Sequence, residues 1–203
     1  ASMLFGDSPQ ETLERARDAM AQGFSAVKFG WGPIGRDSAK SDTEQFQAAR
    51  EGLGADALLM VDFGQIFGTD VSAASERLAG LDEAGALWAE EPFHPGALEA
   101  HAALGAQGSR VRIAAGEAAH NVHMARHLID FGKIGYVQID AGRIGGIGPA
   151  KEVAELADAA LVGDGDRGGD DRGLAQRRAL LVRLDHGSLP TTAISLDDVQ
   201  CTF

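Results

Sequence analysis

Short apolar segments alternate with amphipathic helical segments along residues 1–160 of the chain. The apolar segments, each of a length typical of a β-strand, cover residues 1–5, 25–29, 57–62, 86–90, 111–115 and 135–140. Neighbouring parallel strands need a crossover connection, and the helical segments between the strands supply it. The alternation therefore predicts an α/β protein with a parallel sheet built from about six strand-helix units.

We favour an incomplete (β/α) TIM-type barrel over an open doubly wound sheet. An open dinucleotide-binding sheet carries a glycine-rich phosphate turn after its first strand, and Gly-Asp-Ser-Pro at residues 6–9 is not such a turn. Polar residues also end or closely follow successive strands: Lys28, Asp62, Glu90, Glu117 and Asp140. In a (β/α) barrel all these strand ends lie on one rim, where active sites are assembled.

Local signals predict where two of the helices begin. Ser8 is an expected N-cap, with Pro9 as the first helical residue and Glu11 as the capping-box partner. A second helix is predicted over 70–84, capped by Asp70 and ended by Gly85. Each helix directly follows a predicted strand or its loop, which supports the strand-helix repeat.

The repeat stops near residue 160, so we predict two parts. Residues 1–160 form the partial barrel with a metal-binding rim, and residues 161–203 form a divergent segment rich in glycine and charge. An incomplete barrel exposes the edges of its sheet, and exposed edges promote association. We therefore expect the chain to form homo-oligomers or to aggregate.

Composition excludes several classes of partner. The chain has 30 Asp and Glu against 18 Lys and Arg, a formal charge of -12 that repels nucleic acid and anionic lipid. No apolar run has the roughly 18–20 residues of a membrane span. The single cysteine, Cys201, cannot form an intrachain disulfide, so we expect a reducing, cytoplasmic setting.

Three of the strand-end residues are carboxylates that suit a divalent cation. Asp62, Glu90 and Glu117 are each about one strand-helix repeat apart, so successive strands bring one acid each to the same rim. Carboxylates that lie close together raise one another's pKa unless a cation sits among them. Oxygen ligands with room for water and substrate suit Mg²⁺. The alternative for any single acid is an ordinary loop residue or helix cap.

Several motifs together resemble the barrel of the enolase superfamily, in its mandelate racemase group. They are Val-Asp-Phe-Gly-Gln at 61–65, Trp-Ala-Glu-Glu-Pro-Phe at 88–93, Ala-Gly-Glu at 115–117, Gln-Ile-Asp at 138–140 and Arg-Ile-Gly-Gly at 143–146. The resemblance implies that Asp62, Glu90 and Glu117 are the Mg²⁺ ligands. It also implies that Asp140 is the acid of the His-Asp dyad typical of this group.

The resemblance implies an enzyme that removes the proton α to a carboxylate. Such a step creates a dianionic enediolate, which needs a metal and nearby donors to be stabilised. The expected activity is that of a Mg²⁺-dependent hydro-lyase, an acid-sugar (aldonate or aldarate) dehydratase of sugar-acid catabolism, with a racemase as the other branch. Two alternatives stay open: a non-catalytic truncated remnant that at most binds Mg²⁺, and an unrelated (β/α)-barrel lyase that uses Lys28.

The sequence departs from the group's pattern in two places. The second strand of the group ends in Lys-x-Lys, with the second lysine as base, whereas here Lys28 is followed by Gly30. The resemblance thus implies that Lys28 contacts the substrate carboxylate, with a role as base still open. The dyad histidine is expected near Arg167, where there is none, and the N-terminal capping domain of the family is expected to be absent.

Other residues near the rim are candidates for substrate contact. His120 follows Glu117 closely, Glu91 follows Glu90, and Trp31 follows the second strand. Glu91 is alternatively a support for the metal ligands, and Trp31 alternatively packs in the core. The helical spacing of His120, His123 and His127 also permits a zinc cluster, which we weigh below a plain helix N-terminus.

Overall fold

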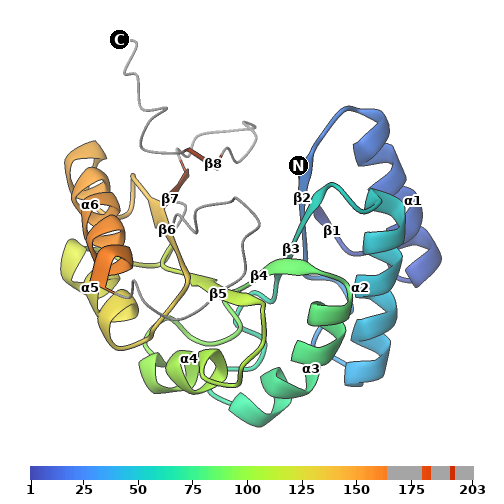
Figure 1. The fold of residues 1–203 in the computed structure, drawn as a ribbon, viewed down its shortest axis with the longest axis horizontal. Helices are drawn as coiled ribbons and strands as arrows, with labels where there is room; N and C mark the ends of the chain where they lie inside the picture. The colour runs from blue at the N-terminus through green and yellow to red at the C-terminus, as the bar shows by residue number, and fades with distance from the viewer. Residues whose placement is uncertain (164–179, 184–192, 195–203) are drawn as a thin grey trace. The chain divides into compact units, whose positions relative to one another are not determined.

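The computed structural model describes residues 1–163, 180–183 and 193–194, drawn in colour in Figure 1. These residues divide into two compact units, one formed by residues 1–114 and the other beginning at residue 115. Every helix and strand of the first unit is described, so its sheet, core and strand ends are considered first.

A parallel sheet forms the centre of the first unit. Its strands are β1 (Ser2–Leu4), β2 (Ala26–Gly30), β3 (Leu58–Asp62), β4 (Ala86–Glu90) and β5 (Arg112–Ala115). Each strand pairs in parallel with the next one along the chain. Because the strands are in sequence order and parallel, their carboxyl ends share one edge, as the strand-helix alternation predicts.

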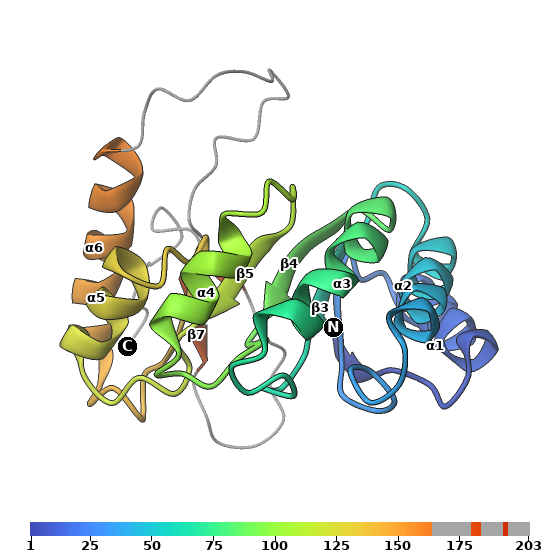
Figure 2. The same cartoon turned by 90° about the horizontal axis from the view of Figure 1, so that it is seen from below.

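Helices connect successive strands: α1 (Pro9–Ala21), α2 (Ala39–Leu53), α3 (Val71–Glu83) and α4 (Leu98–Gly105). Helices α1, α2 and α3 follow one another side by side along the strands (Figures 1 and 2). Phe5, which follows β1, packs with tilted rings against Phe29 of β2 and Phe46 of α2, at centroid distances of 5.2 and 6.0 Å, and all three are buried. This aromatic cluster joins the first two strands to the helix that follows them.

The predicted helix starts are confirmed, but the Glu11 carboxylate accepts from the Asp7 amide at 2.9 Å and not from the Ser8 amide as in a capping box. The Ser8 hydroxyl accepts a hydrogen bond from the Glu11 amide, and Pro9 is the first residue of α1. The Asp70 carboxylate accepts one from the Ala73 amide at 3.0 Å, and α3 ends just before Gly85, which has a φ of 63°. These caps fix each helix relative to the strand before it because they satisfy amide groups that have no partner within the helix.

A buried ion pair joins α2 to α3. The Arg77 Nε donates to the Asp42 Oδ2 at 3.0 Å, and both side chains are at most 6% exposed. Asp42 also accepts from the Gly35 amide, while the Arg77 guanidinium donates to the Asp37 carbonyl. The pair therefore ties the loop after β2 to two helices.

His101 is buried in α4 with one ring nitrogen satisfied. Its Nδ1 lies 2.9 Å from the Ala97 carbonyl, so Nδ1 carries the proton, and its ring packs edge-on against Phe93. Among the described residues, none forms a hydrogen bond with its Nε2. Burial lowers the pKa of His101, and the bond to Ala97 offsets this only in part.

This burial predicts that the first unit is less stable in acid. His101 binds a proton less readily in the fold than in the unfolded chain, so its contribution is constant above the ordinary pKa of 6.5. Below that pH the free energy of unfolding falls, by up to about 2 kcal/mol at pH 5. Urea unfolding at pH 7.5 and 5.0 measures the loss. We expect a smaller loss in His101→Asn, which keeps a donor for Ala97, than in the exposed control His123→Asn; equal losses would contradict the prediction.

The second unit contains β6 (Tyr136–Asp140), α5 (Val122–Asp130) and α6 (Ile147–Gly163). Helices α5 and α6 pack against each other (Figure 2). Strand β6 pairs in parallel with β7 (Leu180–Arg183), which pairs antiparallel with β8 (Ala193–Ile194). The predicted division at residue 160 stays a prediction, and the rest of the segment 161–203, with Arg167 and Cys201, lies outside the described residues.

The strand predictions agree with the structure to within one residue at each end. Predicted segments 57–62, 111–115 and 135–140 correspond to β3, β5 and β6, which each begin one residue later, and segment 86–90 is β4 itself. Within the described ranges no helix is both long and apolar enough to cross a membrane.

Candidate active site

Strand register brings two predicted metal ligands together at the carboxyl edge of the first unit. Asp62, the last residue of β3, is the register partner of Glu90, the last residue of β4. Both residues are buried, with relative exposures of 9% and 1%. Because register partners on parallel strands point to the same face of a sheet, the two carboxylates face the same space.

Lys28 of β2 reaches both carboxylates. Its Nζ lies 3.1 Å from Asp62 Oδ2 and 2.5 Å from Glu90 Oε1. Burial alone would lower the pKa of the Lys28 ammonium, but the charges and hydrogen bonds of Glu90 and Asp62 outweigh burial and raise it. Lys28 is therefore a fixed positive charge that two carboxylates share.

The other oxygen of Glu90 is also held. Trp88, two residues earlier on the same face of β4, donates its indole N–H to Glu90 Oε2 at 3.1 Å. Trp88 is 3% exposed and buried beneath the carboxylate. The lysine and the indole thus hold both oxygens of the Glu90 carboxylate and fix its orientation.

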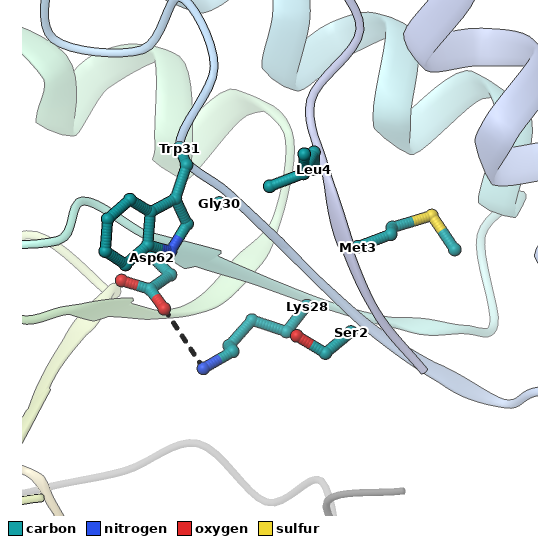
Figure 3. A pocket seen from close by; sticks show the side chains of 7 residues that line it. All are labelled: Ser2, Met3, Leu4, Lys28, Gly30, Trp31 and Asp62. Carbon is teal, nitrogen blue, oxygen red and sulfur yellow. Dashed lines mark ion pairs between the residues drawn. The ribbon is translucent and has the colours of Figure 1, made fainter. Parts of the chain in front are cut away.

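A pocket of about 210 Å³ opens beside this cluster (Figure 3). It is lined by Ser2, Met3 and Leu4 of β1, by Lys28 and Gly30 of β2, by Trp31 and by Asp62. The Lys28 side chain extends toward Asp62 along one side of the pocket (Figure 3). Trp31 is 59% exposed, so its indole lines the pocket without being part of the core.

Strained backbone is concentrated at the same edge. Trp31, Gln65 and Glu91 have φ angles of 60°, 67° and 42°, and they follow the ends of β2, β3 and β4. A left-handed conformation of a residue other than glycine is uncommon and costs of order 1 kcal/mol or more. Such strain persists where surrounding contacts impose it and is typical of functional sites.

Glu91 is held by Gln65, a residue that the sequence analysis did not single out. The Gln65 side-chain amide donates to Glu91 Oε2 at 2.9 Å, and the Gln65 backbone amide donates to the Glu91 carbonyl at 2.7 Å. Glu91 is 5% exposed. The contact joins the loops after β3 and β4, and its only sequence signal is that Gln65 belongs to the 61–65 motif.

Gly30 is tightly enclosed where the group has its second lysine. A Cβ added at Gly30 would lie 2.8 Å from the Asp62 Cβ, closer than side-chain carbons approach one another. Residue 30 is also the register partner of Asp62. The glycine therefore permits the close approach of the β3 carboxylate to β2.

The other candidates belong to the second unit. Glu117 is half-buried, and His120 is exposed just before α5. Asp140 ends β6, is 8% exposed and accepts a hydrogen bond from the Arg143 amide at 2.9 Å. Among the residues with described side chains, no group of three or more His, Cys, Asp or Glu is arranged to hold a metal. This applies to the predicted set Asp62, Glu90 and Glu117 as well as to the zinc alternative of His120, His123 and His127.

Comparison with known proteins identifies the family. The model of the enolase C-terminal domain-like family matches residues 11–165, which is most of the chain. The chain belongs to the enolase C-terminal domain-like family. The incomplete (β/α) barrel and the enolase superfamily resemblance predicted from the sequence are thereby confirmed. Membership of this family excludes the alternative of an unrelated barrel lyase.

Similar proteins of the family are racemases and acid-sugar dehydratases. A predicted mandelate racemase from Rhodobacter sphaeroides, of known crystal structure, is 60% identical with a TM-score of 0.79, covering 91% of this chain and 43% of that one. The L-talarate dehydratase from Polaromonas sp. JS666, solved with Mg and L-glucarate, is 25% identical with a TM-score of 0.70, covering 91% of this chain and 47% of that one.

Among curated proteins, the L-talarate/galactarate dehydratase of Salmonella typhimurium is 32% identical over 147 residues. The match covers 72% of this chain and 35% of that protein. The chain thus spans about a third of this curated relative and less than half of the two solved neighbours.

Proposed function

We propose that the chain carries the metal-binding edge of an enzyme that removes the proton α to the carboxylate of a sugar acid, and that this enzyme is a Mg²⁺-dependent dehydratase. The observation that carries the proposal is the convergence of Asp62 Oδ2 and Glu90 Oε1 on one positive centre, 3.1 and 2.5 Å away. The names of the similar dehydratases support the substrate class.

The donor set fits magnesium. Asp62 and Glu90 supply hard carboxylate oxygens on neighbouring strands, and Mg²⁺ in enzymes is commonly bound by one or two carboxylates together with water and substrate. Glu117, which follows β5, is the third ligand by resemblance to the family. The ion would supply charge stabilisation for the electron density that develops when the α-proton leaves.

Individual residues of the chain have distinct roles in the proposed reaction. Lys28 adds a positive charge beside the substrate carboxylate, and Trp31 covers the open side of the pocket. Glu91, engaged with Gln65, holds the loops after β3 and β4 together instead of meeting the substrate. By resemblance to the family, Asp140 is the acid of the His-Asp dyad that handles the α-proton, and His120 is a further candidate for substrate contact.

Dehydration is favoured over racemisation because β2 offers no second base. Racemisation needs a proton donor and a proton acceptor on opposite faces of the substrate carbon. The family's base position on β2 is Gly30, which has no side chain to accept a proton. We assign to Lys28 the part of a positive charge that stabilises an anion.

Proton exchange tests the proposed function directly. The chelator-treated chain is incubated in D₂O with a panel of sugar acids, with and without Mg²⁺, and loss of the α-proton signal is followed by NMR. We expect Mg²⁺-dependent exchange or elimination with at least one acid. The wild type and Asp56→Asn, which changes an exposed carboxyl, should react, whereas Asp62→Asn should not.

Other results would support the remaining alternative, a non-catalytic remnant that at most binds Mg²⁺, or would contradict the proposed site. If the chain binds Mg²⁺ by calorimetry but exchanges no α-proton in any of the acids, it is a non-catalytic metal-binding part of the fold. If exchange is independent of Mg²⁺ and survives Asp62→Asn, the carboxylate pair is not the site of the reaction.

A further inference from the structure

We infer that Lys28 is an internal counter-ion that occupies the carboxylate pair in the metal-free protein and must withdraw when a divalent cation binds. This inference rests on the metal assignment proposed above and adds to it a competition between a side chain and the metal. It follows from the contacts of Lys28, from the burial of the carboxylates and from the space beside the lysine.

Lys28 and the proposed metal ion would bind the same carboxylate oxygens of Asp62 and Glu90. Lys28 Nζ contacts Asp62 Oδ2 and Glu90 Oε1, one oxygen from each carboxylate, on the side where the two side chains converge. A metal ligand oxygen would lie about 2.0–2.1 Å from Mg²⁺. The ammonium, 3.1 Å from one of these oxygens and 2.5 Å from the other, contacts both atoms that an ion bridging the two carboxylates would bind.

Electrostatic repulsion disfavours binding of Lys28 and of the metal ion to the Asp62–Glu90 pair at the same time. Asp62 and Glu90 are register partners with side chains 12% and 1% exposed, so their mutual repulsion is poorly screened by water. One positive charge between them relieves that repulsion. A second positive charge in the same place would repel the first, so entry of the metal favours departure of the lysine.

The pocket beside the carboxylate pair provides space into which the Lys28 side chain can move. Lys28 lines the pocket together with Ser2 and Trp31, and its side chain is 16% exposed at the pocket side of the pair. Its flexible four-carbon stem allows the ammonium to swing from the carboxylates into this space. There it would lie where the substrate carboxylate is proposed to bind, so metal binding would prepare the anion site.

Calorimetric titration of the chelator-treated full chain with Mg²⁺ tests the competition. Lys28→Met removes the competing charge, and we expect it to bind Mg²⁺ about tenfold more tightly than the wild type. Lys40→Met removes an exposed lysine that forms a surface ion pair with Glu44, and we expect this variant to bind Mg²⁺ with wild-type affinity. Asp62→Asn is expected to lose binding.

Thermal unfolding gives a second readout that does not depend on activity. Without metal, Lys28→Met leaves two buried carboxylates in repulsion, so its melting temperature should fall below that of the wild type. Added Mg²⁺ should then raise the melting temperature of Lys28→Met more than that of the wild type. If Lys28→Met does not fold without metal, Lys28→Gln, which keeps a hydrogen-bond donor, is measured in its place.

The outcomes distinguish this inference from the proposed function. If Lys28→Met binds Mg²⁺ as the wild type does, or more weakly, while Asp62→Asn loses binding, the counter-ion role is wrong and the metal assignment stands. If wild type and both lysine variants all fail to bind millimolar Mg²⁺, the metal assignment and the counter-ion role are both overturned.

Discussion

Replacement of Arg77 by methionine is expected to lower the free energy of unfolding by about 3–5 kcal/mol. The substitution removes the positive partner of Asp42 and leaves a carboxylate that is 1% exposed without its counter-ion. Burial already raises the pKa of Asp42, and the Arg77 hydrogen bond and the Gly35 amide oppose that rise. Without Arg77 the carboxyl must either stay charged in the interior or bind a proton. Urea unfolding at neutral pH measures the loss.

A matched variant separates burial from charge. Arg17 also pairs with a carboxylate, Glu51, but both side chains are more than half exposed. Arg17→Met should therefore cost no more than about 1 kcal/mol. The double variant Asp42→Asn/Arg77→Met should recover part of the loss because it removes the buried charge. Equal losses for Arg77→Met and Arg17→Met would contradict our account of the pair.

The ion pair also bears on the candidate site. Asp42 accepts from Gly35, and Arg77 donates to the Asp37 carbonyl, so both residues hold the loop that begins with Trp31. The Arg77 guanidinium also lies 5.3 Å above the ring of Phe67, in the loop after β3. The loop that begins with Trp31, which lines the pocket, and the loop after β3 thus both contact one buried charge pair.

The sequence was sufficient to predict the strand order and the acids at the strand ends. Both depend on local properties: the apolar run of each strand, and caps such as Ser8 and Asp70. Once strands are parallel and in order, residues at their carboxyl ends must share an edge, so Asp62 and Glu90 were expected to be neighbours. That step needs no side-chain detail.

Contacts between distant loops and helices could not be predicted in the same way. The sequence analysis did not single out Asp42 or Arg77, because only the packing of α2 against α3 buries them. Gln65 likewise meets Glu91 through the geometry of two loops. The role of Lys28 at the substrate carboxylate stays a prediction. The contact of its ammonium with Asp62 and Glu90 was not predicted, and it forms because two buried carboxylates attract the nearest cation.

Gly30 is where the structure adds most to the sequence. From the sequence alone, Gly30 was a missing lysine in the Lys-x-Lys pattern. In the structure Asp62 packs directly against Gly30, since any Cβ at residue 30 would lie 2.8 Å from the Asp62 Cβ. The loss of the second lysine and the position of the carboxylate are therefore linked by packing.

Restoring the lysine is accordingly expected to damage the site. Gly30→Lys should lower the free energy of unfolding by about 1–3 kcal/mol, the usual cost of overpacking, and should weaken Mg²⁺ binding because Asp62 must shift away from Glu90. Gly30→Ala introduces the same Cβ without the ammonium and should show most of the loss of stability. Urea unfolding and calorimetric titration with Mg²⁺ measure the two effects.

The comparison of these variants decides between packing and charge. If Gly30→Ala is neutral and only Gly30→Lys loses Mg²⁺ affinity, the second ammonium is responsible and the enclosure of Gly30 is irrelevant. If Gly30→Lys keeps wild-type stability and racemises the substrate carbon, the strand end accommodates a base, and the preference for dehydration that rests on Gly30 is wrong. We expect neither, because the atoms that oppose the new Cβ include the Asp62 backbone carbonyl, 3.1 Å away, which cannot move without disturbing β3.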